Sequence, residues 1–259
     1  MKNEDLYLRI RRQRSNKENR DIIPFINFTK KIDRSERLLK LVERRIKDRV
    51  SLNEALAQFV ISDITAFEVY FKDLFQASYI FSTCPKEFLD KCEKLVEKKF
   101  DFQELITIIF GEYELCDIVM EHQNFQNLKS IDKVFSVVIK ENFFNDLHGR
   151  DFAIGEKKTE SNIFRLDEGW YEKLEAYLKL RHDLIHDYNP KMRIKREVIE
   201  ELHLNLTDVV IAIDIVFAEE IFKPNVLNTK KRKTEQTTLP NKKRPIGGHC
   251  KGITRAAKK

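Results

Sequence analysis

The chain has 259 residues, of which 42% are hydrophobic and 35% charged, with only seven glycines and six prolines. This composition favours long helices joined by few tight turns, so we expect an almost all-α protein. No apolar run reaches the ~18 residues that a membrane-spanning helix needs, and the cysteines form no C-x-x-C pair. We therefore expect a cytoplasmic protein with no membrane partner, no disulfide framework and no zinc knuckle.

The net charge of +6 is unevenly distributed. Residues 223–259 hold twelve Lys or Arg against the single acid Glu235, which leaves 36 basic and 41 acidic side chains in residues 1–222. Because this basic tail has few large apolar residues, we expect it to be disordered. It could bind nucleic-acid phosphates, act as a nuclear localisation signal if the source cell has a nucleus, or be a solvated terminus without a dedicated role. Its first basic run is Lys230, Lys231, Arg232 and Lys233.

Three segments are expected: a basic N-terminal extension over 1–24, a helical domain over 25–222, and the tail. Apolar residues at helical spacing predict a first helix that stops at a capping box over residues 51–54, Ser-Leu-Asn-Glu. A second helix would begin there. It carries apolar side chains at intervals of three and four as far as Phe75, so one broad face must be buried.

Shorter helices are expected next. Pro85 would open a third helix, and Asp101, with Glu104 three residues later, would cap a fourth. Ser130 is the expected cap of a fifth. Between 149 and 165 the periodicity lapses, which predicts a polar loop near the functional face.

Two longer helices complete the predicted domain. One is capped by Asp167 and ends before Pro190, because the residue that precedes a proline avoids the α region. The other runs from about residue 195 to 222. The inward positions of the Asp167-capped helix are expected to be Trp170, Leu174, Tyr177 and Leu178.

The last turns of the Asp167-capped helix hold the one segment that suggests chemistry, residues 181–186 (Arg-His-Asp-Leu-Ile-His). Arginine is a permanent cation with planar donors suited to phosphate oxygens, and histidine can take and return a proton near neutrality. At about 100° per residue, Arg181 and His186 lie about 140° apart on an ideal helix, whereas His182 and His186 lie about 40° apart. The two histidines could therefore share a ligand, while Arg181 and His186 would need a second copy to complete a site.

A shared ligand would be a metal ion. Residues 182–186 resemble the zinc-protease pattern H-E-x-x-H, with Asp183 in the position of the glutamate. The aspartate is shorter by one methylene, and His203 is the only nearby downstream histidine that could be the third ligand. The His-Asp pairs at 182–183 and 186–187 also resemble those of metal-dependent phosphohydrolases, whose further histidine and aspartate are not identified here. We favour a metal-independent function of this segment over both metal-dependent alternatives.

The same segment resembles the signature of the HEPN superfamily of metal-independent ribonucleases: an arginine, a spacer of four to six residues that begins with a polar residue, and a histidine. Here the spacer has four residues, and His182 stands where asparagine is common. The helix that contains residues 55–74 looks like the first long helix of the RiboL-PSP-type HEPN group. This resemblance covers about residues 36–222 and implies a HEPN-like helical bundle with long core helices.

The resemblance also implies an endoribonuclease in which the 2′-hydroxyl of the RNA attacks the adjacent phosphorus, without a metal or other cofactor. His186 would be the general base or acid, and Arg181 would stabilise the charge on the phosphorane. His182 and Asp183 would support these two residues. The implied products are a 2′,3′-cyclic phosphate and a 5′-hydroxyl.

Two kinds of partner are expected beside RNA. A homodimer that brings two such helix ends together would supply a base, an acid and two arginines. Members of the superfamily include toxins, phage-defence effectors and RNA-processing enzymes, so an antitoxin or a regulatory protein is a further expected partner. Tyr188 and the basic run 230–233 would contact the RNA, by stacking and by binding phosphates.

A catalytically inactive HEPN-like helical module that binds RNA or a protein partner is the alternative. Arg181 could simply pair with Glu175 or Asp183, and a surface ion pair of this kind contributes ~0–1 kcal/mol. His186 could satisfy the carbonyls of the last helical turn. Each catalytic candidate therefore has a purely structural explanation as well.

Overall fold

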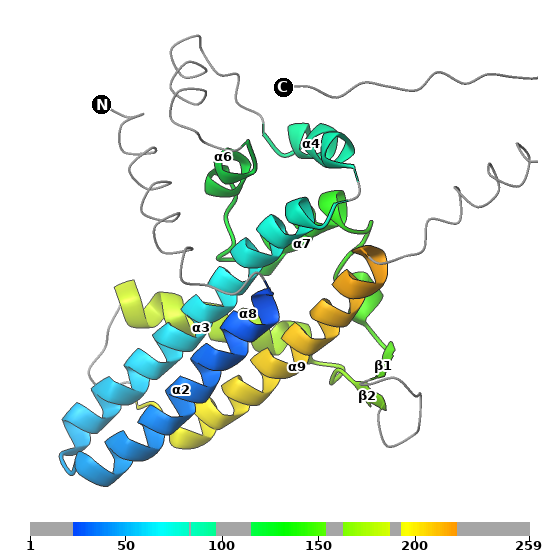
Figure 1. Cartoon of the computed structure of the whole chain (residues 1–259). Coiled ribbons are helices and arrows are strands. Elements are labelled where there is room, and N and C mark those ends of the chain that lie inside the picture. The colour runs from blue at the N-terminus through cyan, green and yellow to red at the C-terminus, as the bar shows by residue number, and fades with distance from the viewer. Residues whose placement is uncertain (1–22, 83, 97–114, 154–162, 187–192, 222–259) are drawn as a thin grey trace, which may run out of the picture. The chain divides into compact units, whose positions relative to one another are not determined.

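The computed structural model describes residues 23–82, 84–96, 115–153, 163–186 and 193–221 (Figure 1). It is mostly helical, and its long helices pack on one another, as the composition predicted. The helices are α2 (Pro24–Arg45), α3 (Arg49–Ile80), α4 (Pro85–Glu93), α6 (Leu115–His122), α7 (Leu128–Val138), α8 (Trp170–His186) and α9 (Arg196–Ile221), with a short 3₁₀ helix, η1 (Asn145–Leu147). The basic tail and all of the N-terminal extension except Ile23 and Pro24 lie outside the described residues.

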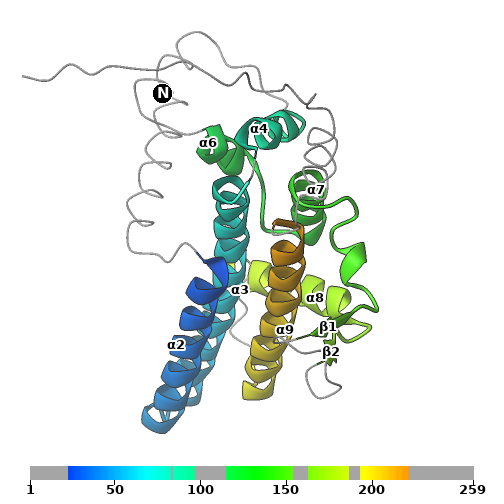
Figure 2. The same cartoon turned by 45° about the vertical axis from the view of Figure 1, so that its right-hand side comes forward.

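The helices α2 and α3 form an antiparallel pair (Figures 1 and 2). Pro24 stands in the first turn of α2, where its missing N–H removes no helical hydrogen bond. The side chain of Asp48 caps α3, because it accepts hydrogen bonds from the backbone N–H and the hydroxyl of Ser51 at 2.8 and 2.7 Å. The predicted start of this helix at Ser51 was therefore wrong by one turn.

The central element is α3, which packs against α2, α8 and α9 and also against α4, α6 and α7. Its predicted broad apolar face is confirmed, since fifteen of its side chains are buried. Aromatic rings concentrate around Phe71, whose centroid lies 4.8 Å from that of Phe67 and 5.4 Å from that of Phe135 on α7. Such edge-on and tilted pairs are favourable arrangements for aromatic side chains. The core therefore fixes α3 in the centre of the helical unit.

One of the predicted short helices begins at a different residue in the structure. The cap of α7 is Asn127, which accepts a hydrogen bond from the backbone N–H of Ser130 at 2.7 Å, so the prediction of Ser130 as the cap was wrong. Pro85 opens α4 as predicted. The predicted helix at Asp101 lies outside the described residues.

The predicted loop between 149 and 165 contains a pair of strands. β1 (Asp151–Ala153) and β2 (Ile163–Arg165) are antiparallel, with Phe152 opposite Phe164. Their rings stack at 5.3 Å, and the guanidinium of Arg165 donates to Asp151 at 2.6 and 2.9 Å. Cross-strand pairs of these two kinds stabilise paired strands, which is why residues 151–153 and 163–165 form strands although the sequence predicted a loop.

The helices α8 and α9 follow the sequence prediction. Of the four predicted inward positions of α8, Trp170, Leu174 and Tyr177 are buried and Leu178 is half-buried. α9 begins and ends within one residue of its predicted bounds. α8 lies across α3 rather than along it (Figures 1 and 2). Among the residues that the structure describes, no helix is long and apolar enough to cross a membrane.

Candidate active site on α3 and α8

Arg181, in the last turns of α8, forms an ion pair with Glu68 of α3. Its Nη1 lies 2.9 Å from the Glu68 Oε1, and the two side chains are only 16% and 10% exposed. Within the described residues, no ion pair joins Arg181 to Glu175 or Asp183, the surface partners that its own helix offers. The arginine is therefore held between two helices rather than at the surface of one.

Burial makes this pair energetically sensitive. It raises the pKa of the Glu68 carboxyl, while the charges of Arg181 and Lys72 oppose the rise. A buried carboxylate needs a partner, because removing one member of a buried ion pair costs about 3–5 kcal/mol. The Nε of Arg181 is itself buried and has no hydrogen-bond acceptor within the described residues. Glu68 therefore fixes the cation without satisfying all of its donors.

His182 and His186 are both exposed and lie side by side. Their ring centroids are 4.6 Å apart, and their planes meet at 47°. The closeness of the two rings agrees with the helical repeat, because side chains four residues apart differ in direction by only about 40° around the helix axis. The described residues show no hydrogen bond or ring contact between either imidazole and Arg181. The structure thus brings the two histidines together and directs the arginine to α3.

The remaining predicted site residues divide into two groups. Asp183 is half-buried on α8, next to Leu184, which is buried in the core and anchors this end of the helix. Tyr188 and the basic run 230–233 lie outside the described residues, so their contacts with RNA stay predictions.

His203, the possible third zinc ligand, has a different partner. Its Nε2 lies 2.6 Å from Oδ2 of Asp63, a carboxylate of α3 that is completely buried. Across the described ranges, no three His, Cys, Asp or Glu side chains gather as metal ligands. The structure therefore places His203 in an interhelical pair between α9 and α3 and does not join it to His182 and His186.

Two buried acids of α3, Asp63 and Glu68, were not predicted from the sequence as partners of specific residues. Glu68 and Asp63 stand in a helix whose other side chains are largely apolar and buried. An acid in such a position requires a cation or a hydrogen-bond donor from another element. By this rule Asp63 and Glu68 each require a partner, but the rule does not say which basic residue each of them contacts.

No protein-family model, no curated protein and no solved structure matched this chain. Functional conclusions therefore depend on the geometry of α3 and α8. That geometry combines a nearly buried cation, held by the carboxylate of another helix, with two exposed imidazoles on the same helix end.

Proposed function

We propose that this protein is a metal-independent endoribonuclease of the HEPN type, in which two copies of the α8 helix end form one active site. The observation that carries the proposal is that one helix end holds both a nearly buried cation, Arg181 paired with Glu68 of α3, and the two exposed imidazoles of His182 and His186. A fixed cation stabilises charge in a transition state without reorganisation at the moment of reaction. The packed long helices are consistent with the HEPN-like bundle that the sequence resembles.

The proposed reaction needs only groups that this helix end offers. One imidazole, assigned to His186, accepts the proton of the RNA 2′-hydroxyl, whose oxygen forms a bond to the adjacent phosphorus. The bond from phosphorus to the 5′-oxygen breaks, and a second imidazole protonates that oxygen. Arg181 stabilises the added charge on the phosphorane. The products are a 2′,3′-cyclic phosphate and a 5′-hydroxyl, and no electrons are gained or lost.

The way the side chains point supports a composite site formed by two copies. In one chain the guanidinium turns to α3, whereas both imidazoles are on the exposed side of α8. A twofold axis beside His186 would place each pair of imidazoles opposite the other, so that base and acid lie on either side of one phosphate. His182 and Asp183 then orient the substrate or the neighbouring imidazole.

One observation favours a second candidate function, a catalytically inactive module that binds RNA or a protein. Arg181 already has an internal partner, and a purely structural arginine would look the same in this respect. The two functions differ in whether the exposed imidazoles are needed. Substitution of His186 therefore separates them, because within the described residues this exposed side chain contacts only the ring of His182.

The test is incubation of the purified protein with labelled single-stranded RNA in excess chelator. We expect cleavage by the wild type, and a loss of at least 100-fold in His186→Ala, as is usual when a general acid or base is removed. His122→Ala, an exposed histidine at the end of α6, is the matched control and should cleave normally. Cleavage that requires added zinc or manganese would refute the metal-independent mechanism, and RNA binding without cleavage would favour the inactive module.

A further inference from the structure

A groove with a basic edge runs between α2 and α3. It contains two cavities of about 410 and 470 Å³, which adjoin because Lys31, Arg34 and Ser62 line both of them. We call it the α2–α3 groove and define it by Lys30, Lys31 and Arg34 of α2 and Gln58, Ser62 and Thr65 of α3.

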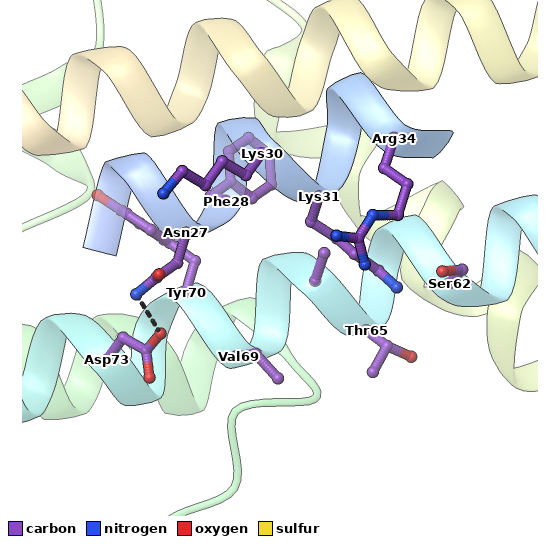
Figure 3. Close-up of a pocket in the computed structure, with 11 residues that line it drawn as sticks. Asn27, Phe28, Lys30, Lys31, Arg34, Ser62, Thr65, Val69, Tyr70 and Asp73 are labelled. Carbon is purple, nitrogen blue, oxygen red and sulfur yellow. Dashed lines mark hydrogen bonds between the residues drawn. The ribbon is translucent and has the colours of Figure 1, made fainter. Parts of the chain in front are cut away.

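The basic side chains that line this groove all come from α2. Figure 3 shows Lys31 and Arg34 over the gap between the helices, opposite Ser62 and Thr65. Within the described part of the chain, neither Lys31 nor Arg34 forms an ion pair with a carboxylate. The carboxylate that lines the first cavity, Asp73, lies further along α3, where it accepts a hydrogen bond from an α2 asparagine. A ligand over Lys31 and Arg34 would therefore meet two cations and the hydroxyl of Ser62, which suits phosphate oxygens. The hydroxyl of Thr65 donates instead to the carbonyl of Ile61 on its own helix, at 2.7 Å.

The groove borders the candidate active site. Thr65, which lines it, precedes Glu68 by three residues, so the two lie about 4.5 Å apart along the axis of α3, on adjoining faces. A third cavity shares Ala55 and Gln58 with the second. Its lining also includes the acid Glu54 and Leu184 of α8, which stands between Arg181 and His186 in the chain. The groove thus leads from the cations of α2 to the helix end that carries the proposed chemistry.

We infer that the α2–α3 groove binds the backbone of a single RNA strand next to the phosphate that is cleaved. The inference rests on the proposed function and adds the place on the molecule where the substrate strand binds. The size of the cavities is the reason for assigning a single strand, since volumes of about 410 and 470 Å³ are those of small-molecule sites and leave no room for a segment of duplex. The first cavity has the size of a small-molecule site, so it accommodates one unstacked nucleotide over an apolar floor that includes Phe28, Ala66 and Val69.

The test compares two double substitutions in the full-length protein. Lys31→Gln with Arg34→Gln removes the cations of the groove, and Lys129→Gln with Lys133→Gln removes two exposed cations of α7 as the matched control. Binding is measured by fluorescence anisotropy with a 2′-O-methylated single strand, which cannot be cleaved. Each phosphate contact to a single strand contributes a salt slope of about −0.7, so two lost contacts reduce the slope by about 1.4 and weaken binding about 25-fold at 0.1 M salt. The control variant should keep the slope and affinity of the wild type.

Three further outcomes separate this inference from the proposed function. Equal binding by the groove and control variants, while the wild type cleaves RNA, would overturn the groove and leave the ribonuclease intact. Selective loss of binding in the groove variant, while the wild type cleaves no RNA, would support the groove and refute the enzyme. An equal loss of affinity for a duplex of the same length, or for a free mononucleotide, would overturn the assignment to a single strand. Melting temperatures of the variants show whether they are folded.

Discussion

Replacement of Arg181 by methionine gives the sharpest test of the ion pair on which the site is built. Methionine keeps the length of the aliphatic stem but leaves the Glu68 carboxylate without its cation, in a position where both side chains are 16% exposed or less. Breaking a buried pair in this way costs about 3–5 kcal/mol, whereas breaking an exposed pair costs ~0–1 kcal/mol. For a domain of this size we expect a fall in Tm of roughly 10 °C.

The stability that Arg181→Met loses should depend on pH, and the pKa of Glu68 determines in which direction. Burial already raises the pKa of Glu68, and Arg181 is the largest of the charges that oppose this rise, so its removal raises the pKa further. In the window above the ordinary value of 4.5, the folded variant then binds a proton more readily than the unfolded chain. Stability therefore falls as pH rises through that window and is best retained at its acidic end.

The measurement is urea denaturation of three proteins from pH 4 to 8: the wild type, Arg181→Met, and Arg181→Met combined with Glu68→Leu. Replacing both partners by apolar side chains removes the unpaired carboxylate, so the double variant should recover most of the lost stability and the added pH dependence should disappear. A loss of less than about 1 kcal/mol in the single variant, with no pH dependence, would show that the pair behaves as a surface ion pair. Arg181 would then not be a cation that burial and Glu68 hold in a fixed position.

Three other changes test the described fold. His203→Ala leaves the completely buried Asp63 without its hydrogen-bond partner, so urea denaturation should show a loss of about 1–3 kcal/mol, and no loss of stability would contradict a buried contact between α9 and α3. Asn127→Ala removes the cap of α7 and should lower the free energy of unfolding by about 1 kcal/mol; an unchanged urea midpoint would argue against this cap. Burial raises the pKa of Asp214 from 3.8 to about 6, so stability should fall as pH rises from about 4 to about 6. Asp214→Asn should flatten this dependence and stabilise the protein at pH 7 by about 1–2 kcal/mol after allowance for partial exposure, and an unaltered pH profile would contradict the assignment.

Helical periodicity predicted most of the described helices. The first residues of α3 and α7, however, were predicted wrongly, and for the same physical reason. In both α3 and α7 the predicted cap was a serine, and in both the structure places that serine at the third helical position, where its N–H is the donor. The true caps are Asp48 and Asn127, three residues earlier, whose side chains accept those hydrogen bonds. The patterns Asp-x-x-Ser and Asn-x-x-Ser were visible in the sequence, because an N-cap accepts from the residue three positions later.

The candidate site shows a different limit of prediction. The approach of His182 and His186 depends only on the helical repeat, and the structure confirms it. The pairing of Arg181 with Glu68 depends on where α8 crosses α3, and no local pattern contains that information. The sequence could therefore indicate that Glu68 needs a cation but could not choose Arg181 over another basic residue.

Glu68 is also the residue at which a structural and a catalytic role of the ion pair can be separated. Glutamine at position 68 keeps the shape of the side chain and one oxygen acceptor for Arg181, but it removes the charge that holds the guanidinium. If the pair positions Arg181 for the reaction, kcat should fall about 100-fold, because displacement of a catalytic group by about 1 Å has an effect of that size. Affinity for an uncleavable single strand should stay equal or increase, since the arginine keeps its charge and loses a competing carboxylate.

The control for this experiment is Lys72→Gln, which removes a charge that also acts on Glu68 but leaves the ion pair with Arg181 in place. Cleavage rates of this variant should stay close to those of the wild type. An unchanged kcat in Glu68→Gln, together with a lower Tm, would mean that the carboxylate acts only in stability. A fall in kcat with unchanged or tighter binding would mean instead that a buried acid of α3 sets the position of the arginine, which is the arrangement expected when a fold orients a cation for phosphate chemistry.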